Sequence, residues 1–328
     1  MFLTDKRSSL LPFHHHHHHH TAAAPPKPKP SRRQQQQQPD KATAARYEAA
    51  LASRLRGLLP LPPSPLAALA RVADLLALAL ADAAPALAGE RPDAAAVAAH
   101  LDAGVALLDA CNAIAARLDR LRRRRLLARF ALHLLPSSPP RARAALDDHR
   151  AGAHAPSSPT PAALPSLPFD QPRGARCLSP AARVLVAVDA VSSLAAATAA
   201  AALGSIDDDA ATLTFPRVSG GGAEFPWAEA FNAVSGQVTA LAAGTSEVDA
   251  VDEAVAKLAS ALGGGVDDEA ALRAAAQEVE ERTEELSARL DRLSDAVNAV
   301  FRAALGLRNA ELGSFMSGVG PAEKTCKK

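Results

Sequence analysis

Side chains that could perform chemistry are few and scattered. Seven of the eleven histidines form one run, His14 to His20, which could bind metal ions or could be an affinity tag. The proline and glutamine runs beside it favour natural low complexity. His100 and His133 fall on one predicted helix but too far apart to share a ligand, so a structural role is favoured for each.

The sequence lacks the motifs that carry common catalytic mechanisms. It contains no G-x-S-x-G, H-E-x-x-H or paired C-x-x-C pattern. The glycine runs at 220–222 and 263–265 have no strand before them and no lysine after them, as a phosphate loop needs. Three widely spaced cysteines do not suggest a disulfide framework and favour a reducing compartment. We therefore expect a protein that is not an enzyme, and assign no catalytic, cofactor or metal residues.

Charge, rather than catalytic chemistry, is the strongest polar signal. Residues 1–150 carry a net charge of +10 and residues 151–328 a net charge of −9, although the whole chain carries only +1. The basic residues gather in one predicted helix: Arg117, Arg120, Arg122, Arg123, Arg124, Arg125 and Arg129. The acidic residues gather in another: Glu278, Glu280, Glu281, Glu284 and Glu285. Such asymmetry predicts either pairing between the halves or a basic surface for an acidic partner.

Composition indicates that helices position these clusters. Hydrophobic residues make up 48% of the chain but aromatic residues only 3%, and a core rich in Ala and Leu favours helices over strands. Periodicity, proline and N-cap signals predict helices over 41–59, 64–85, 92–135 and 179–204. Further helices are expected from 226, from the capping box Ser246–Asp249, and over 267–312, with a short helix over 140–149 left open.

The fold class expected from this pattern is all-α, an elongated helical bundle. Its two longest helices, 92–135 and 267–312, each span roughly 65 Å at 1.5 Å per residue, and the second keeps a heptad-like spacing typical of coiled coils. The expected divisions are a disordered low-complexity tail (1–40), N-terminal helices (41–135), a Pro/Ser-rich linker (136–178), C-terminal helices of the same bundle (179–315) and a flexible tail (316–328).

An antiparallel arrangement of the two long helices would bring the opposite charges together. With their ends aligned, residue 125 would lie opposite about residue 278, and the arginine and glutamate clusters would meet. The alternative is a free basic surface that binds anionic lipid or an acidic partner. Nucleic acid is not expected, because aromatic residues are nearly absent near the cluster and no nucleic-acid-reading motif appears.

Residues 183–203 raise the question of a membrane span. The segment has the length and apolar character of a spanning helix, but Asp189, Ser192, Ser193 and Thr198 oppose insertion. A helix buried in the bundle is the favoured interpretation, and a peripheral or single-span membrane protein is the alternative.

Three motifs together resemble one plant family. They are LLDACNAI at 107–114 in a helix that ends in ALHLL, PWAEAF at 226–231, and LDRLSDAVNAVFRAALGLRNAEL at 290–312. In this order and spacing they are similar to the BYPASS-type proteins, also called ROH-like proteins, over roughly residues 42–315. The motif residues are interpreted as packing positions: Leu107, Leu108, Cys111, Asn112, Trp227 and Phe231.

The resemblance implies a non-enzymatic, all-helical plant protein. Its function would be regulatory: members restrain a mobile root-derived signal that arrests shoot growth, and another branch is linked to an exocyst subunit and secretion. A cytoplasmic protein with protein partners, associated in some cases with the plasma membrane or endoplasmic reticulum, is the expectation. Asn112, with Asp109, could form hydrogen bonds between helices.

Overall fold

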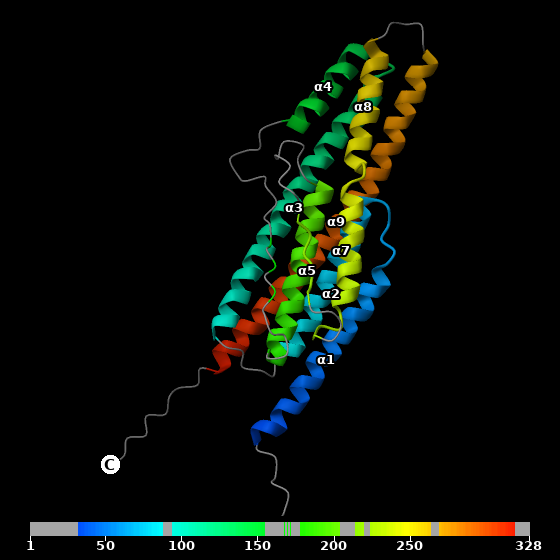
Figure 1. Cartoon of the computed structure of the whole chain (residues 1–328). Coiled ribbons are helices and arrows are strands. Elements are labelled where there is room, and N and C mark those ends of the chain that lie inside the picture. Colours follow the sequence, from blue (N-terminus) through cyan, green and yellow to red (C-terminus); the bar gives the residue numbers. More distant parts are fainter. Residues whose placement is uncertain are drawn as a thin grey trace, which may run out of the picture.

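The computed structural model describes residues 32–87, 94–154, 178–203, 214–219, 224–263 and 269–318, together with residues 167, 169 and 171. Every regular element in these ranges is an α-helix, which confirms the predicted all-α class. Figure 1 shows the helices lying side by side along the length of an elongated molecule. Residues 1–31 and 319–328, most of the expected tails, lie outside the described ranges.

The first two helices form a hairpin at the N-terminal side of the bundle. Helix α1 (Arg32–Leu58) begins inside the stretch assigned to the tail, because arginine and glutamine form helices readily. Tyr47, Leu51 and Leu55 of α1 are buried. Helix α2 (Pro65–Leu87) begins with Ser64 as its N-cap, whose hydroxyl accepts a hydrogen bond from the Ala67 amide at 3.1 Å. Helix α2 extends two residues beyond Pro85, where the sequence pattern predicted its end.

The next two helices pack against each other across a short turn. Helix α3 (Ala94–Leu134) ends before Pro136, and helix α4 (Pro139–His154) turns back along it. Helix α4 is longer than the 140–149 segment left open in the sequence, and it occupies the first part of the predicted linker. Ala128 and Ala131 of α3 and Ala142 of α4 are fully buried, so the two backbones approach closely over small side chains. Residues 155–166 of the predicted linker lie outside the described ranges.

Helix α5 (Pro180–Leu203) lies inside the bundle, against α2, α1 and α3. Among the described helices, α5 is long and apolar enough to cross a membrane. However, 78% of its most apolar 18-residue stretch is buried within the protein. Its one acidic residue, Asp189, lies 3.6 Å from the Nδ1 atom of His100 on α3. A core helix accounts for both properties, because its apolar surface already has protein neighbours.

Three aromatic residues pack together where α7 begins. Helix α7 (Ala228–Ala242) follows Trp227, which is fully buried and packs edge-to-face with Phe231 at 5.7 Å between ring centroids. Phe225 is also fully buried, with its ring centroid 5.3 Å from that of Trp227. Asn232 of α7 holds the extended segment 214–219 by accepting from the Val218 amide (2.9 Å) and donating to its carbonyl (2.8 Å).

The predicted capping box begins the next helix. Helix α8 (Glu247–Gly263) follows Ser246, whose hydroxyl accepts from the Asp249 amide at 3.1 Å, while the Asp249 carboxylate accepts from the Ser246 amide at 3.1 Å. This reciprocal pattern confirms the sequence signal and satisfies two amides at the helix start.

The longest helix, α9 (Glu269–Gly318), lies along α2, α3 and α8. Its contacts with α3 join His100 to Glu311 (3.2 Å) and Arg122 to Asp291 (3.1 Å), so the two helices run in opposite directions along their contact. The predicted register is wrong: Arg125 meets Ser287 rather than residue 278. The ends are not aligned, because the first turns of α9 extend past the end of α3 and pack against α8, where Lys257 binds Glu278 at 3.1 Å.

Candidate interaction surface

The arginine cluster of α3 is divided between contacts inside the bundle and solvent. Arg122 binds Asp291 of α9 at 3.1 Å and Asp119 at 3.4 Å. Arg124 binds Asp252 of α8 at 2.5 Å and donates to the His149 carbonyl of α4 at 3.4 Å. Arg125 donates to the Ser287 hydroxyl, and Arg117 and Arg120 are half-buried. Consecutive residues of a helix point in directions 100° apart, so a run of arginines must reach several neighbours.

Two arginines of the cluster remain exposed beside two apolar side chains. Arg123 and Arg129 form no ion pair with any residue that the structure describes. Leu126 and Phe130, one helical turn apart on the same side of α3, are 56% and 52% exposed. We call Arg123, Leu126, Arg129 and Phe130 the α3 outer face. It holds the two most exposed large apolar side chains of the described residues, and adjacent exposed apolar groups mark interaction sites better than isolated ones.

The α3 outer face could also have been predicted from the spacing of the apolar residues in the sequence. The buried stripe Leu107, Cys111, Ile114, Leu118 and Leu121 continues at the same spacing to Arg125, Ala128 and Leu132. Leu126 and Phe130 fall outside that stripe, and a helix that buries the stripe must expose them.

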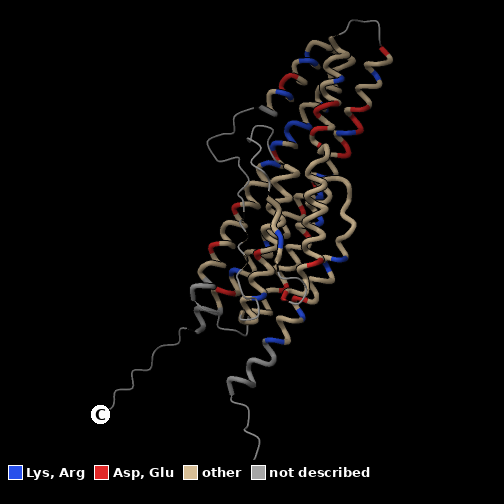
Figure 2. Tube along the Cα trace, in the orientation of Figure 1, with Lys and Arg blue, Asp and Glu red and all other residues tan. Residues whose placement is uncertain are grey.

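The glutamate cluster is also divided. Glu278 binds Lys257, while Glu285 binds Arg289 at 2.5 Å and Arg282 at 3.5 Å. The remaining members, Glu280, Glu281 and Glu284, are exposed and form no ion pair within the described ranges. The contacts described for the two clusters are therefore made mainly with other residues rather than with each other. Figure 2 shows the blue and red segments of both clusters in the half of the molecule that contains α4 and α8.

The two buried histidines belong to the structure of the bundle. His100 lies between Asp189 and Glu311; burial alone lowers its pKa, but the neighbouring carboxylates of Asp189 and Glu311 outweigh burial, so the pKa is raised. Burial, followed by the nearby charge of Arg124, lowers the pKa of His149 to about 4. His100 contacts carboxylates on α5 and α9, and the Nε2 atom of His149 lies 3.8 Å from Asp252 on α8. Among the described residues, no group of three or more His, Cys, Asp or Glu side chains could hold a metal ion.

The family-motif residues lie mostly in the core. Leu107, Leu108 and Cys111 are buried, as are Trp227 and Phe231. Asn112 and Asp109, however, are exposed, which corrects the assignment of Asn112 as a packing position and the expectation of helix-to-helix hydrogen bonds from both. Asn112 directly follows the buried Cys111, so it points about 100° away from the stripe that meets the bundle.

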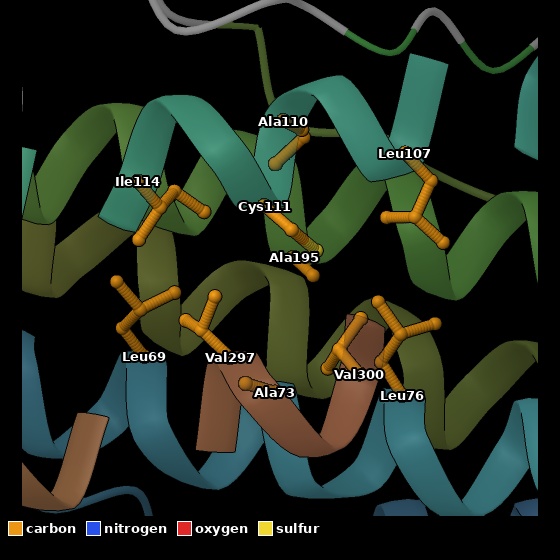
Figure 3. A pocket seen from close by; sticks show the side chains of 11 residues that line it. Leu69, Ala73, Leu76, Leu107, Ala110, Cys111, Ile114, Ala195, Val297 and Val300 are labelled. Carbon is orange, nitrogen blue, oxygen red and sulfur yellow. The ribbon is translucent and has the colours of Figure 1, made fainter. Parts of the chain in front are cut away.

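A small apolar cavity of about 30 Å³ lies beside Cys111, between α2, α3, α5 and α9. Figure 3 shows Val297, Val300, Leu69 and Leu76 on one side of it and Ile114, Cys111 and Leu107 on the other. The space is about that of one water molecule and its lining offers almost no polar surface, so it is a packing defect rather than a ligand site. Burial raises the pKa of the Cys111 thiol to about 11, which keeps this sulfur protonated and unreactive at neutral pH.

Comparisons with protein-family models, with curated proteins and with solved structures each found no match to this chain, so its likeness to the BYPASS-type proteins rests on the three sequence motifs.

Proposed function

We propose that this protein is a non-enzymatic helical adaptor that binds another protein through the α3 outer face. The observation that carries the proposal is the pair Leu126 and Phe130, exposed one turn apart and flanked by Arg123 and Arg129. Protein interfaces are enriched in aromatic residues and arginine, and an apolar centre with charged edges supplies both affinity and orientation.

The resemblance to BYPASS-type proteins supplies the cellular context of this proposal. It favours a location in the cytoplasm of plant cells and a role in growth signalling or in exocyst-linked secretion. An exocyst subunit is therefore the first partner to test.

A second candidate is attachment to an anionic membrane surface. Arginine beside exposed apolar side chains is also the pattern of helices that lie in a membrane interface, and α5 is the alternative means of attachment. The exposed carboxylates Glu280 and Glu284 on the neighbouring helix oppose this candidate, because they would repel anionic headgroups.

The test is capture of exocyst subunits by the tagged full-length protein from plant cytosol. Leu126→Ser with Phe130→Ser should abolish capture, while Leu78→Ser, which changes a 50% exposed leucine on α2, should leave it intact. Equal capture by all three proteins would exclude the α3 outer face as the binding surface.

Fractionation of the same cells with salt and carbonate washes tests the membrane candidate. Recovery of the protein in the soluble fraction supports an adaptor. Release from membranes by salt indicates the arginines, and resistance to carbonate indicates that α5 spans the bilayer.

A further inference from the structure

We propose that the α3 outer face also binds a second copy of this chain, held face to face by the exposed arginines of α3 and the exposed glutamates of α9. This inference rests on the proposed function in one respect, that the same face is a protein interface. It adds the identity of the occupant and the symmetry of the complex.

The first step is the position of the glutamates relative to the arginines. Asp291 and Ser287 of α9 contact Arg122 and Arg125 of α3. Glu284 and Glu280 precede them at steps of three and four residues, so they continue the same side of α9, toward α3. Glu284 and Glu280 are exposed, although the same side of α9 contacts α3 further along the helix, at Ser287 and Asp291.

The second step is the level of these charges along the bundle. The two helices run in opposite directions with the same rise per residue. Going back seven residues along α9 from Asp291 reaches Glu284, and going forward seven along α3 from Arg122 reaches Arg129. Arg129 and Glu284 therefore lie level with each other on adjacent helices, and neither has an ion pair among the described residues.

The third step is that this surface is complementary to itself. It carries exposed arginines on α3 and exposed glutamates on α9, which come level with each other at Arg129 and Glu284, and Leu126 and Phe130 lie beside the arginines. A two-fold axis parallel to the helices would place α3 of one copy over α9 of the other, so that Arg129 meets the partner's Glu284. A two-fold axis in the same plane but perpendicular to the helices would place the arginines of one copy over the arginines of the other. Charge thus selects one of the two symmetric arrangements.

The fourth step is the exclusion of simpler partners. An anionic membrane or a uniformly acidic protein would satisfy Arg123 and Arg129 but would be repelled by Glu280 and Glu284. A uniformly basic partner would be attracted by Glu280 and Glu284 but repelled by Arg123 and Arg129. The occupant must carry both charges on neighbouring helices with apolar groups beside them, and a second copy of this surface does so.

The experiment measures the mass of the full-length protein by sedimentation equilibrium over a range of concentrations and salt. Wild type should be a dimer that weakens with added salt. Arg123→Glu with Arg129→Glu should raise the dimer dissociation constant on the order of 100-fold, because both facing strips become acidic. Glu280→Arg with Glu284→Arg should do the same, because both strips become basic.

Mixing the two charge-reversed proteins tests the geometry itself. In the mixed pair, the acidic α3 of the first variant faces the basic α9 of the second, and the acidic α9 of the first faces the basic α3 of the second. A heterodimer of near wild-type affinity is therefore expected. The matched controls Arg302→Glu and Asp102→Arg, at exposed positions outside the surface, should remain dimeric. Circular dichroism and thermal unfolding should show that all these variants keep the wild-type fold.

Three outcomes would overturn the inference: a monomeric wild type at every concentration, dimers that survive both reversals, or a mixture that does not associate. Binding of monomers to phosphatidylserine vesicles would overturn it in favour of a membrane. If the protein is monomeric yet capture of its cellular partner depends on Leu126 and Phe130, self-association fails while the proposed function stands. If it dimerises but capture ignores those residues, the proposed function fails while self-association stands.

Discussion

Arginine is used in two different ways in two regions of this bundle. Arg183, at the start of α5, donates two hydrogen bonds to the Glu48 carboxylate of α1, at 3.0 and 2.9 Å. It donates a third to the Glu224 carbonyl at 2.8 Å. Its guanidinium also lies over the Phe225 ring, 5.3 Å from the centroid. Arg123 and Arg129 of α3, by contrast, face solvent without an ion pair in the described ranges.

The difference shows how the surroundings decide the role of the same side chain. Glu48 is only 4% exposed, so Arg183 neutralises a buried carboxylate and is not available to bind a partner molecule. The exposed arginines contribute little to folding, which leaves their charge available for binding. Mutations in the first region should therefore change stability, and mutations in the second should change association.

The largest effect should come from breaking the buried pair. Glu48→Ala leaves the Arg183 guanidinium half-buried without its carboxylate, and we expect a loss of about 3–5 kcal/mol in the free energy of unfolding. Urea titration followed by circular dichroism measures it. The double change Glu48→Leu with Arg183→Met should recover most of the loss, because no unpaired charge remains. A loss below about 1 kcal/mol, the range of a surface pair, would contradict the assigned importance of this contact.

The next effect should come from His100, which is buried between two carboxylates. His100→Gln should cost about 1–3 kcal/mol, because Asp189 and Glu311 lose a charged partner. The raised pKa of His100 also predicts a dependence on pH. A raised pKa in the fold adds stability that is complete below the unfolded value of about 6.5 and disappears as pH rises through the folded value.

The pH prediction is tested by unfolding wild type and His100→Gln in parallel from about pH 6 upward, past the usual histidine pKa of about 6.5. The stability difference between the two proteins should shrink as pH rises. Taking the difference removes the contribution of His149, whose pKa is lowered and acts in the opposite direction. A difference that stays constant would mean that folding does not shift the pKa of His100.

A smaller effect should come from the cavity beside Cys111. Val300→Ile adds one methylene next to the empty volume of about 30 Å³, and we expect a gain of up to about 0.8 kcal/mol. Val234→Ile is the control, because Val234 is fully buried in α7 and does not line this cavity, so overpacking should destabilise. Equal effects on thermal unfolding would mean that the cavity cannot accept a methyl group.

The smallest effect on stability should come from the α3 outer face. At a protein concentration where wild type is monomeric, Arg123→Glu with Arg129→Glu should change the free energy of unfolding by no more than about 0.5 kcal/mol, although the same variant should lose association. A large loss of stability would show that these arginines support the fold and would remove the contrast with Arg183.

The helices and their starts could be predicted because their causes are local. Ser64-Pro65, Ser179-Pro180 and the box at Ser246–Asp249 each mark a helix start in the structure, since capping depends on residues three or four apart. The start of α1 at Arg32 differs from the prediction at 41. The low-complexity composition before residue 41 predicts disorder, although its arginine and glutamine residues favour a helix.

The sequence by itself determined the all-α class, the positions of the helices and the presence of two opposite charge clusters, because periodicity and composition act over short distances along the chain. Only the tertiary structure decided which charges are used inside the bundle. The register of α3 against α9, offset so that Arg125 meets Ser287, depends on how far α9 extends along α8. That offset arises from packing between helices far apart in sequence. It gives Arg122 and Arg124 partners within the bundle and leaves Arg123 and Arg129 exposed.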